Sequence, residues 1–192
     1  MISLFETVIP EVAVERVVQT LRSGRLSEGE QVKRLESELV SRFGWPNAAA
    51  LNNGTAALHL ALVCAGVGPG DEVITTAQTF VATAMVVAQV GARVVFADLE
   101  PNSPNVDAAD VARRVTSRTR AIIVVHYGGY PCDLAALRAV ADRAGVALVE
   151  DAAHALGATF RGAPVGTLGD YGAFSFQAIK QVTSGDGGAL CV

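Results

Sequence analysis

Residues 146–192 read VALVEDAAHALGATFRGAPVGTLGDYGAFSFQAIKQVTSGDGGALCV, and the interpretation of the chain starts from this segment. It begins with a short apolar run that ends on two carboxylates, Glu150 and Asp151. It then crosses a Gly-rich segment and reaches FSFQAIK, where Lys180 stands among small and polar residues. A short apolar run bounded in this way predicts a buried strand whose last side chains are acidic.

The order of Asp151 and Lys180 points to a chemistry. A buried strand that ends on an acid, followed by one lysine beside glycines, is what a pyridoxal 5'-phosphate (PLP) site needs. The acid keeps the pyridine nitrogen protonated, and the lysine amine holds the aldehyde as a Schiff base. Taken singly, a lysine is usually a solvated surface charge and a strand-end aspartate is usually a turn former or helix cap. Their order and surroundings make them the candidate catalytic residues.

Four linked pieces carry a family resemblance: EDAAH (150–154), GDYGAFSF (169–176), AIK (178–180) and TSGDGG (183–188). In this order they resemble the DegT-type sugar-nucleotide aminotransferases, which are fold-type I PLP enzymes. The resemblance implies transamination of a nucleotide-linked keto sugar with L-glutamate as amino donor. The product would be an amino sugar for polysaccharide or secondary-metabolite biosynthesis. It also implies a homodimer with shared active sites.

The same resemblance implies roles for further residues. His154 is expected to contact the phenolic oxygen of PLP or to flank its ring, and Ser175 to bind the phosphate. Phe80 matches a family aromatic that stacks on the ring, although an isolated Phe is more often a core residue. Gln177 and Gln181 flank the lysine and are candidates for contacts with the sugar.

The apolar run AAAL (48–51), followed by NNGTAALHLAL (52–62), predicts a strand, a Gly turn and a helix N-terminus. This arrangement presents free backbone N–H groups to an anion. We interpret Gly54, Thr55 and Ala56 as the site for the cofactor phosphate. The alternative is a simple capped helix, with Asn53 or Thr55 as the cap.

Strand and helix patterns alternate along the chain, which predicts an α/β fold in three layers. We expect a mostly parallel seven-stranded sheet with helices on both faces. Helical spacing of apolar residues at 11–22 and 31–44 predicts a lead-in over residues 1–44, either the family's dimer-forming segment or an ordinary amphipathic helix pair. The expected strands are 48–51, 73–76, 93–97, 121–125, 146–150, 172–176 and 187–191.

Composition narrows the function classes. A net charge of −4 argues against nucleic acid as the main partner. No apolar stretch reaches the ~20 residues of a membrane helix, and the start has no signal-peptide pattern. The three cysteines, Cys64, Cys132 and Cys191, share no metal-ligand spacing, so we expect reduced thiols, no metal and a cytoplasmic location.

The extent of the chain leaves alternatives open. We expect a single PLP-binding large domain over 1–192, without the small C-terminal domain of the family, because GGALCV stops inside an apolar strand. The chain is then either an aminotransferase or a cofactor-binding module without turnover of its own. A PLP-dependent sugar dehydratase is a further alternative, but such enzymes carry His where Lys180 stands. His126, after a predicted strand, is either a hydrogen-bonded loop residue or a substrate contact.

Overall fold

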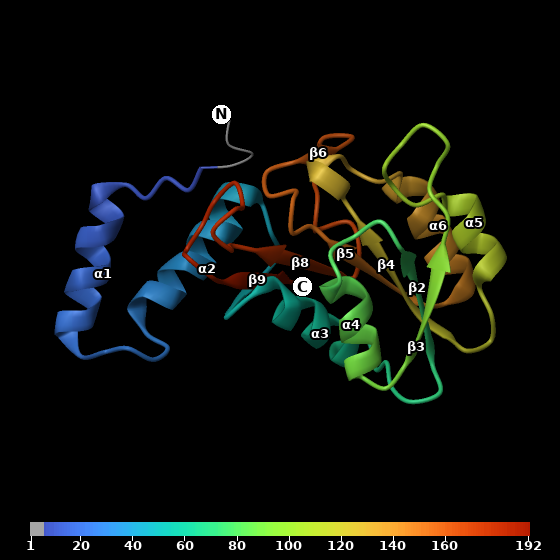
Figure 1. Ribbon diagram of the computed structural model, residues 1–192, viewed down its shortest axis with the longest axis horizontal. Helices are drawn as coiled ribbons and strands as arrows, with labels where there is room; N and C mark the ends of the chain where they lie inside the picture. Colours follow the sequence, from blue (N-terminus) through green and yellow to red (C-terminus); the bar gives the residue numbers. More distant parts are fainter. Residues whose placement is uncertain (1–5) are drawn as a thin grey trace.

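The computed structural model describes residues 6–192, and its centre is one seven-stranded sheet (Figure 1). The strand order is β1-β9-β8-β5-β4-β2-β3. Strand β9 pairs antiparallel with β1 and β8, and all other pairs are parallel. The strands are β1 Ala48–Leu51, β2 Glu72–Thr76, β3 Arg93–Ala97, β4 Thr119–Val125, β5 Ala147–Asp151, β8 Tyr171–Ser175 and β9 Gly188–Cys191.

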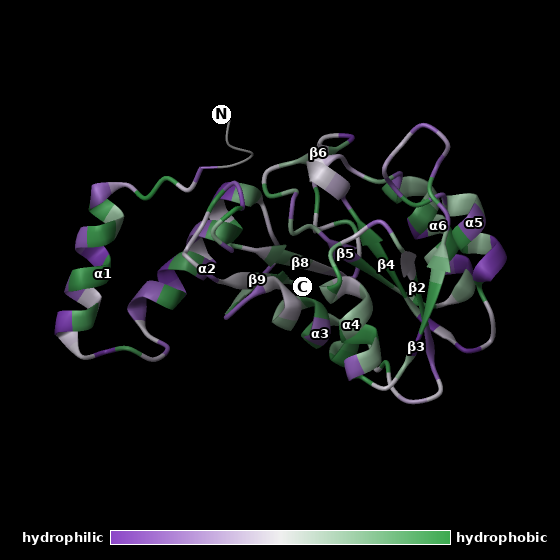
Figure 2. Ribbon diagram, viewed as in Figure 1, coloured by the Kyte–Doolittle hydropathy of each residue, from purple (hydrophilic) through white to green (hydrophobic). Residues whose placement is uncertain are grey.

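Side-chain alternation in the central strands buries both faces of this sheet. Ile123 and Val149 pack with α3 (Gly54–Cys64) and α4 (Ala82–Gln89) on one face. Ile122 and Leu148 pack on the other face with α5 (Ala108–Arg114) and α6 (Leu134–Ala144). In Figure 2 the central strands are accordingly largely green. The predicted three-layer, mostly parallel α/β fold is confirmed.

The strand boundaries agree with the prediction to within two residues, but one element was missed. Strands β6 (Thr159–Phe160) and β7 (Ala163–Pro164) form a separate two-stranded hairpin. Its turn places Arg161 and Gly162 at positive φ, a conformation typical of tight hairpin turns. Strands of two residues are too short to show an alternating pattern, so the sequence carried no signal for them.

The two N-terminal helices differ in how they attach to the sheet. Helix α1 (Glu11–Ser23) buries no residue and lies apart from the sheet in Figure 1. Helix α2 (Glu30–Phe43) buries Leu39, and the carboxylate of Glu36 accepts the N–H of Ala50 in β1 at 2.9 Å. Gly44 ends α2 in the left-handed conformation that glycine adopts readily at helix ends. No helix among the described residues is long and apolar enough to cross a membrane.

Candidate active site

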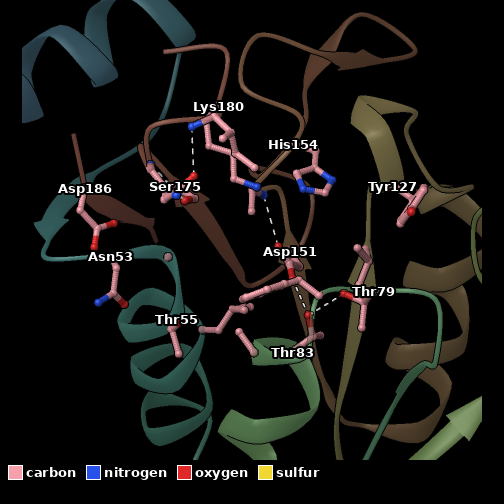
Figure 3. A pocket seen from close by; sticks show the side chains of 18 residues that line it. Asn53, Thr55, Thr79, Thr83, Tyr127, Asp151, His154, Ser175, Lys180 and Asp186 are labelled. Atoms are coloured by element: carbon pink, nitrogen blue, oxygen red, sulfur yellow. Dashed lines mark hydrogen bonds between the residues drawn. The ribbon is translucent and has the colours of Figure 1, made fainter. Parts of the chain in front are cut away.

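A cavity of about 570 Å³ lies where β5 and β8 end and α3 begins (Figure 3). Open parallel sheets commonly bind ligands at this edge. Seven of the eight predicted cofactor-binding residues line the cavity: Gly54, Thr55, Phe80, Asp151, His154, Ser175 and Lys180. The eighth, Ala56, does not line it. Segments far apart in the sequence therefore meet at one site.

Asp151 is the last residue of β5, and its side chain reaches the cavity from the α3–α4 face of the sheet. Only 6% of the residue is exposed. Its Oδ2 accepts a hydrogen bond from the Thr83 hydroxyl at 2.8 Å, and its Oδ1 accepts the N–H of Ala153 at 3.2 Å. A carboxylate has about four lone-pair positions, so acceptor capacity remains for a ligand.

Glu150, the preceding residue, points to the opposite face and is fully buried. One oxygen pairs with His126 Nε2 at 2.9 Å. Because His126 Nδ1 accepts the N–H of Cys132, its Nε2 carries the proton and donates to the carboxylate. Three backbone N–H groups also donate to Glu150: those of Gly166, Leu168 and Gly169.

These contacts decide the role of His126 and the state of Glu150. Burial raises the pKa of Glu150, but the hydrogen bond from His126 and those from the backbone N–H groups of Gly166 and Gly169 more than offset it. The net pKa therefore lies below its ordinary value. His126 has no exposed surface, so a direct substrate contact is excluded and the hydrogen-bonded alternative is confirmed.

The N-terminus of α3 forms another wall of the cavity. Asn53 caps the helix by accepting the N–H of Ala56 at 2.8 Å. The Ala56 amide, which was predicted to bind phosphate, thus donates to the cap in this structure. The N–H groups of Gly54 and Thr55 belong to the first turn, where a helix offers no internal acceptor. A Cβ on Gly54 would lie 2.9 Å from Ser175 Cβ, so glycine permits the close approach of α3 to β8.

Lys180 and His154 are half-buried in the same cavity. Burial lowers the pKa of Lys180, and the negative charge of Asp151 partly opposes this. The pKa of His154 is also lowered, first by burial and then by the positive charge of Lys180, against an opposite effect of Asp151. A lysine with a lowered pKa is more readily neutral, which nucleophilic attack requires. The His154 ring lies edge-on to Tyr127, with centroids 6.1 Å apart.

Of the remaining predicted residues, three line the cavity and Gln181 does not. Phe80 lines the cavity and is 70% exposed, so the alternative of a core position is wrong. Ser175 and Gln177 also line it. Gln181 does not; its side-chain amide donates to the carbonyl of His154 at 2.5 Å.

Several cavity residues were not singled out from the sequence: Asn53 as a wall residue, Thr79, Thr83, Tyr127 and Asp186. Thr79 and Thr83 lie next to or within three residues of Phe80, the only residue of TFVATA (79–84) for which the sequence suggested a role. Their importance depends on contact with Asp151, which is 68 residues from Thr83 in the sequence. No local pattern reports such a contact.

Comparison with known proteins shows the family of this chain. Residues 8–192 match the model of the DegT/DnrJ/EryC1/StrS aminotransferase family. The chain belongs to this family. It is 45% identical over 177 residues to the spore coat polysaccharide biosynthesis protein SpsC of Bacillus subtilis, covering 92% of this chain and 46% of SpsC. The chain thus spans about half the length of this curated relative.

Solved structures of family members share the fold. The PLP form of Spr1654 from Streptococcus pneumoniae, a sugar aminotransferase by its description, matches with a TM-score of 0.95 and 35% identity. The match covers 99% of this chain and 52% of Spr1654. DesI, solved in the presence of its TDP-sugar product, matches with a TM-score of 0.90 and 40% identity, covering 97% of this chain and 47% of DesI.

Proposed function

We propose that the chain binds PLP and belongs to an enzyme that transfers an amino group from L-glutamate to a nucleotide-linked keto sugar. The observation that carries this is the placement of Lys180, Asp151 and the N-terminus of α3 around one cavity. A single ligand there can meet an amine, a carboxylate and an anion-binding helix end. PLP has a group for each of these partners.

The chain's own residues would hold each part of the cofactor. The first-turn amides of α3, at Gly54 and Thr55, suit the phosphate, with the Ser175 hydroxyl beside them. Asp151 suits the ring nitrogen, and Phe80 offers an aromatic face to the ring. Lys180 would hold the aldehyde. When bound, PLP supplies an aldehyde and an electron-accepting ring that allow an amino group to pass between donor and acceptor.

Lys180 has a second task in this proposal. Its lowered pKa suits a group that takes a proton from the amino donor and returns it later, because such a group must change protonation state easily. His154, half-buried beside the ring site, would contact the phenolic oxygen or flank the ring. Lys180 also favours transamination over dehydration, because the related PLP-dependent sugar dehydratases carry histidine at this position.

The substrate and the assembly are also part of the proposal. The TDP-sugar product in whose presence DesI was solved supports a nucleotide-linked sugar as the acceptor. Exposed apolar side chains on and beside α3 and α4 support a homodimer: Leu60, Val63, Val81 and Met85. Cys132 and Cys191 are buried free thiols, which supports a reducing compartment, the cytoplasm.

An absorbance titration with PLP tests this function. The chain contains two lysines, Lys180 and the exposed Lys33 on α2, so Lys33→Ala is a matched control. We expect wild type and Lys33→Ala to develop the absorbance band of lysine-linked PLP, and Lys180→Ala to lack it. L-glutamate should then bleach the band. A band that glutamate does not bleach would favour the alternative of a cofactor-binding module, and no band in wild type would contradict the proposal.

A further inference from the structure

Two threonine hydroxyls lead from the loop before α4 to Asp151 (Figure 3). Thr79 Oγ1 lies 2.7 Å from Thr83 Oγ1, and Thr83 Oγ1 lies 2.8 Å from Asp151 Oδ2. All three residues line the cavity, yet Thr83 itself has no exposed surface. The three side chains thus form a short polar chain that ends at the ligand site.

The direction of the hydrogen bonds in this chain follows from its last member. An ionised carboxylate only accepts hydrogen bonds, so the single hydroxyl proton of Thr83 points to Asp151. Thr83 Oγ1 can then only accept from Thr79, which fixes the proton of Thr79 as well. The carboxylate of Asp151 therefore fixes the hydroxyl orientations of Thr83 and Thr79, and their hydrogen bonds in turn hold the carboxylate in place.

The position of Thr83 makes this orientation rigid. Thr83 lies in the first turn of α4, and a β-branched side chain on a helix has few χ1 rotamers. Oδ1 of Asp151 is fixed separately by the N–H of Ala153. With one donor on each oxygen, the plane of the carboxylate is set, and its remaining lone pairs are left for the cavity.

Burial of the Thr83 hydroxyl does not by itself explain its hydrogen bond to Asp151. Thr75, on strand β2, is also fully buried, and its hydroxyl has no hydrogen-bond partner among the described residues. A threonine hydroxyl can thus be buried in this fold without being used. The hydroxyl of Thr83 is used, and its acceptor is the buried carboxylate of the cavity, which has capacity left for a ligand.

We propose that Thr83 is a positioning residue that acts through Asp151: it fixes the carboxylate for contact with the ring nitrogen of PLP, and Thr79 fixes the hydroxyl of Thr83. This inference rests on the proposed function, because it assumes that PLP occupies the cavity. It assigns Thr83 no contact with the cofactor. Its effect must therefore depend on the ring nitrogen and on no other part of PLP.

Equilibrium binding of two ligands tests this dependence. The first is PLP, and the second is its 1-deaza analogue, in which a C–H group replaces the ring nitrogen while the aldehyde and phosphate remain. Both are titrated into the purified chain as wild type, Thr83→Val, Thr83→Ser and the matched control Thr75→Val. We expect Thr83→Val to weaken PLP binding about tenfold, the size of a lost hydrogen bond to a charged group. Its affinity for the analogue should equal that of wild type.

The two further variants separate positioning from folding. Thr83→Ser keeps the hydroxyl and should restore most of the PLP affinity, whereas Thr75→Val removes an unused hydroxyl and should leave both affinities unchanged. If Thr83→Val weakens both ligands equally, or neither, the positioning role is overturned while the PLP site stands. If wild type binds neither ligand, the proposed function itself fails.

Discussion

Glu150 and Asp151 are consecutive residues at the end of β5, yet their surroundings differ completely. On one face of the sheet, Glu150 receives His126 and three backbone N–H groups, and none of its surface is exposed. On the other face, Asp151 receives one hydroxyl and one backbone N–H and borders a cavity. In Figure 3 Asp151 lies, in that view, between Lys180 and Thr83.

The difference shows how one strand end serves two purposes. The donors around Glu150 come from the segments after β4 and before β8, so the carboxylate ties these loops together and stabilises the rim of the site. Asp151 retains acceptor capacity that only a ligand can use. A buried charge with all its partners in the protein is structural, whereas one that faces a cavity with spare capacity is available for chemistry.

The largest effect is expected for Glu150→Gln. The amide group would place N–H donors against the backbone N–H groups that now donate to the carboxylate. Removing one partner of such a buried set costs about 3 kcal/mol of unfolding free energy. Urea denaturation measures this cost, and Glu28→Gln, at an exposed position, is the matched control, with a change within about 0.5 kcal/mol. Equal stabilities of the two variants would contradict the structural role of Glu150.

Asp151→Asn should change stability little but weaken PLP binding strongly. The amide oxygen can still accept from Ala153, and the Thr83 hydroxyl can turn to accept from the amide nitrogen, so the unfolding free energy should change by less than about 1 kcal/mol. Affinity for PLP should fall by roughly 10- to 100-fold, because a hydrogen bond to a charged group is lost. Denaturation and PLP titration of the same preparation test both parts. A variant that loses stability but keeps PLP affinity would reverse the comparison.

Glu72, at the opposite end of the parallel strands, is a third buried carboxylate. It accepts hydrogen bonds from Thr116, Arg93 and Arg118, which lower its pKa from 4.5 to about 2. Because the folded-state pKa is depressed, its contribution to stability is complete above pH 4.5 and is lost as the pH falls towards 2.

Thermal unfolding of Glu72→Gln tests this pH dependence. We expect a Tm several degrees below wild type above pH 4.5, and a difference that shrinks near pH 2. The control is Glu28→Gln, whose Tm should follow wild type throughout. A difference for Glu72→Gln that stays constant across this pH range would show that the carboxylate is not stabilised by its neighbours.

The smallest expected effect is a shift in the pKa of His154, which two variants should move in opposite directions. Lys180 lowers the pKa of His154 and Asp151 raises it. In the PLP-free chain, Lys180→Gln should therefore raise the pKa of His154, and Asp151→Asn should lower it. NMR titration of the imidazole C–H signals measures both, with His154 assigned by its own substitution. Shifts of the same sign in both variants would mean that the three groups do not share the site.

The sequence predicted the parts of this site that depend on local pattern. Strand β5 and its terminal acids follow from an apolar run that stops at Glu150, and the Gly turn before α3 follows from NNGT. Both signals lie within a few residues of the groups that they position. The sheet follows from the alternation of strand and helix patterns along the chain.

The parts that were missed depend on packing between distant segments. The contact of Thr83 with Asp151 requires α4 to cover the end of β5, which depends on the strand order rather than on any local spacing. The use of the Ala56 amide by Asn53 was open from sequence, since a cap and an anion site have the same residues at a helix start. The burial of His126 likewise depends on the chain after β5 folding over it.

Reductive trapping is the most direct test of the central claim that Lys180 holds PLP in this cavity. The chain is incubated with PLP, reduced with borohydride to make the lysine link permanent, digested and analysed by mass spectrometry. With two lysines in the sequence, the account predicts the added mass on the peptide that contains Lys180 and none on the peptide that contains Lys33. Label on Lys33 alone, or equal label on both lysines, would contradict it.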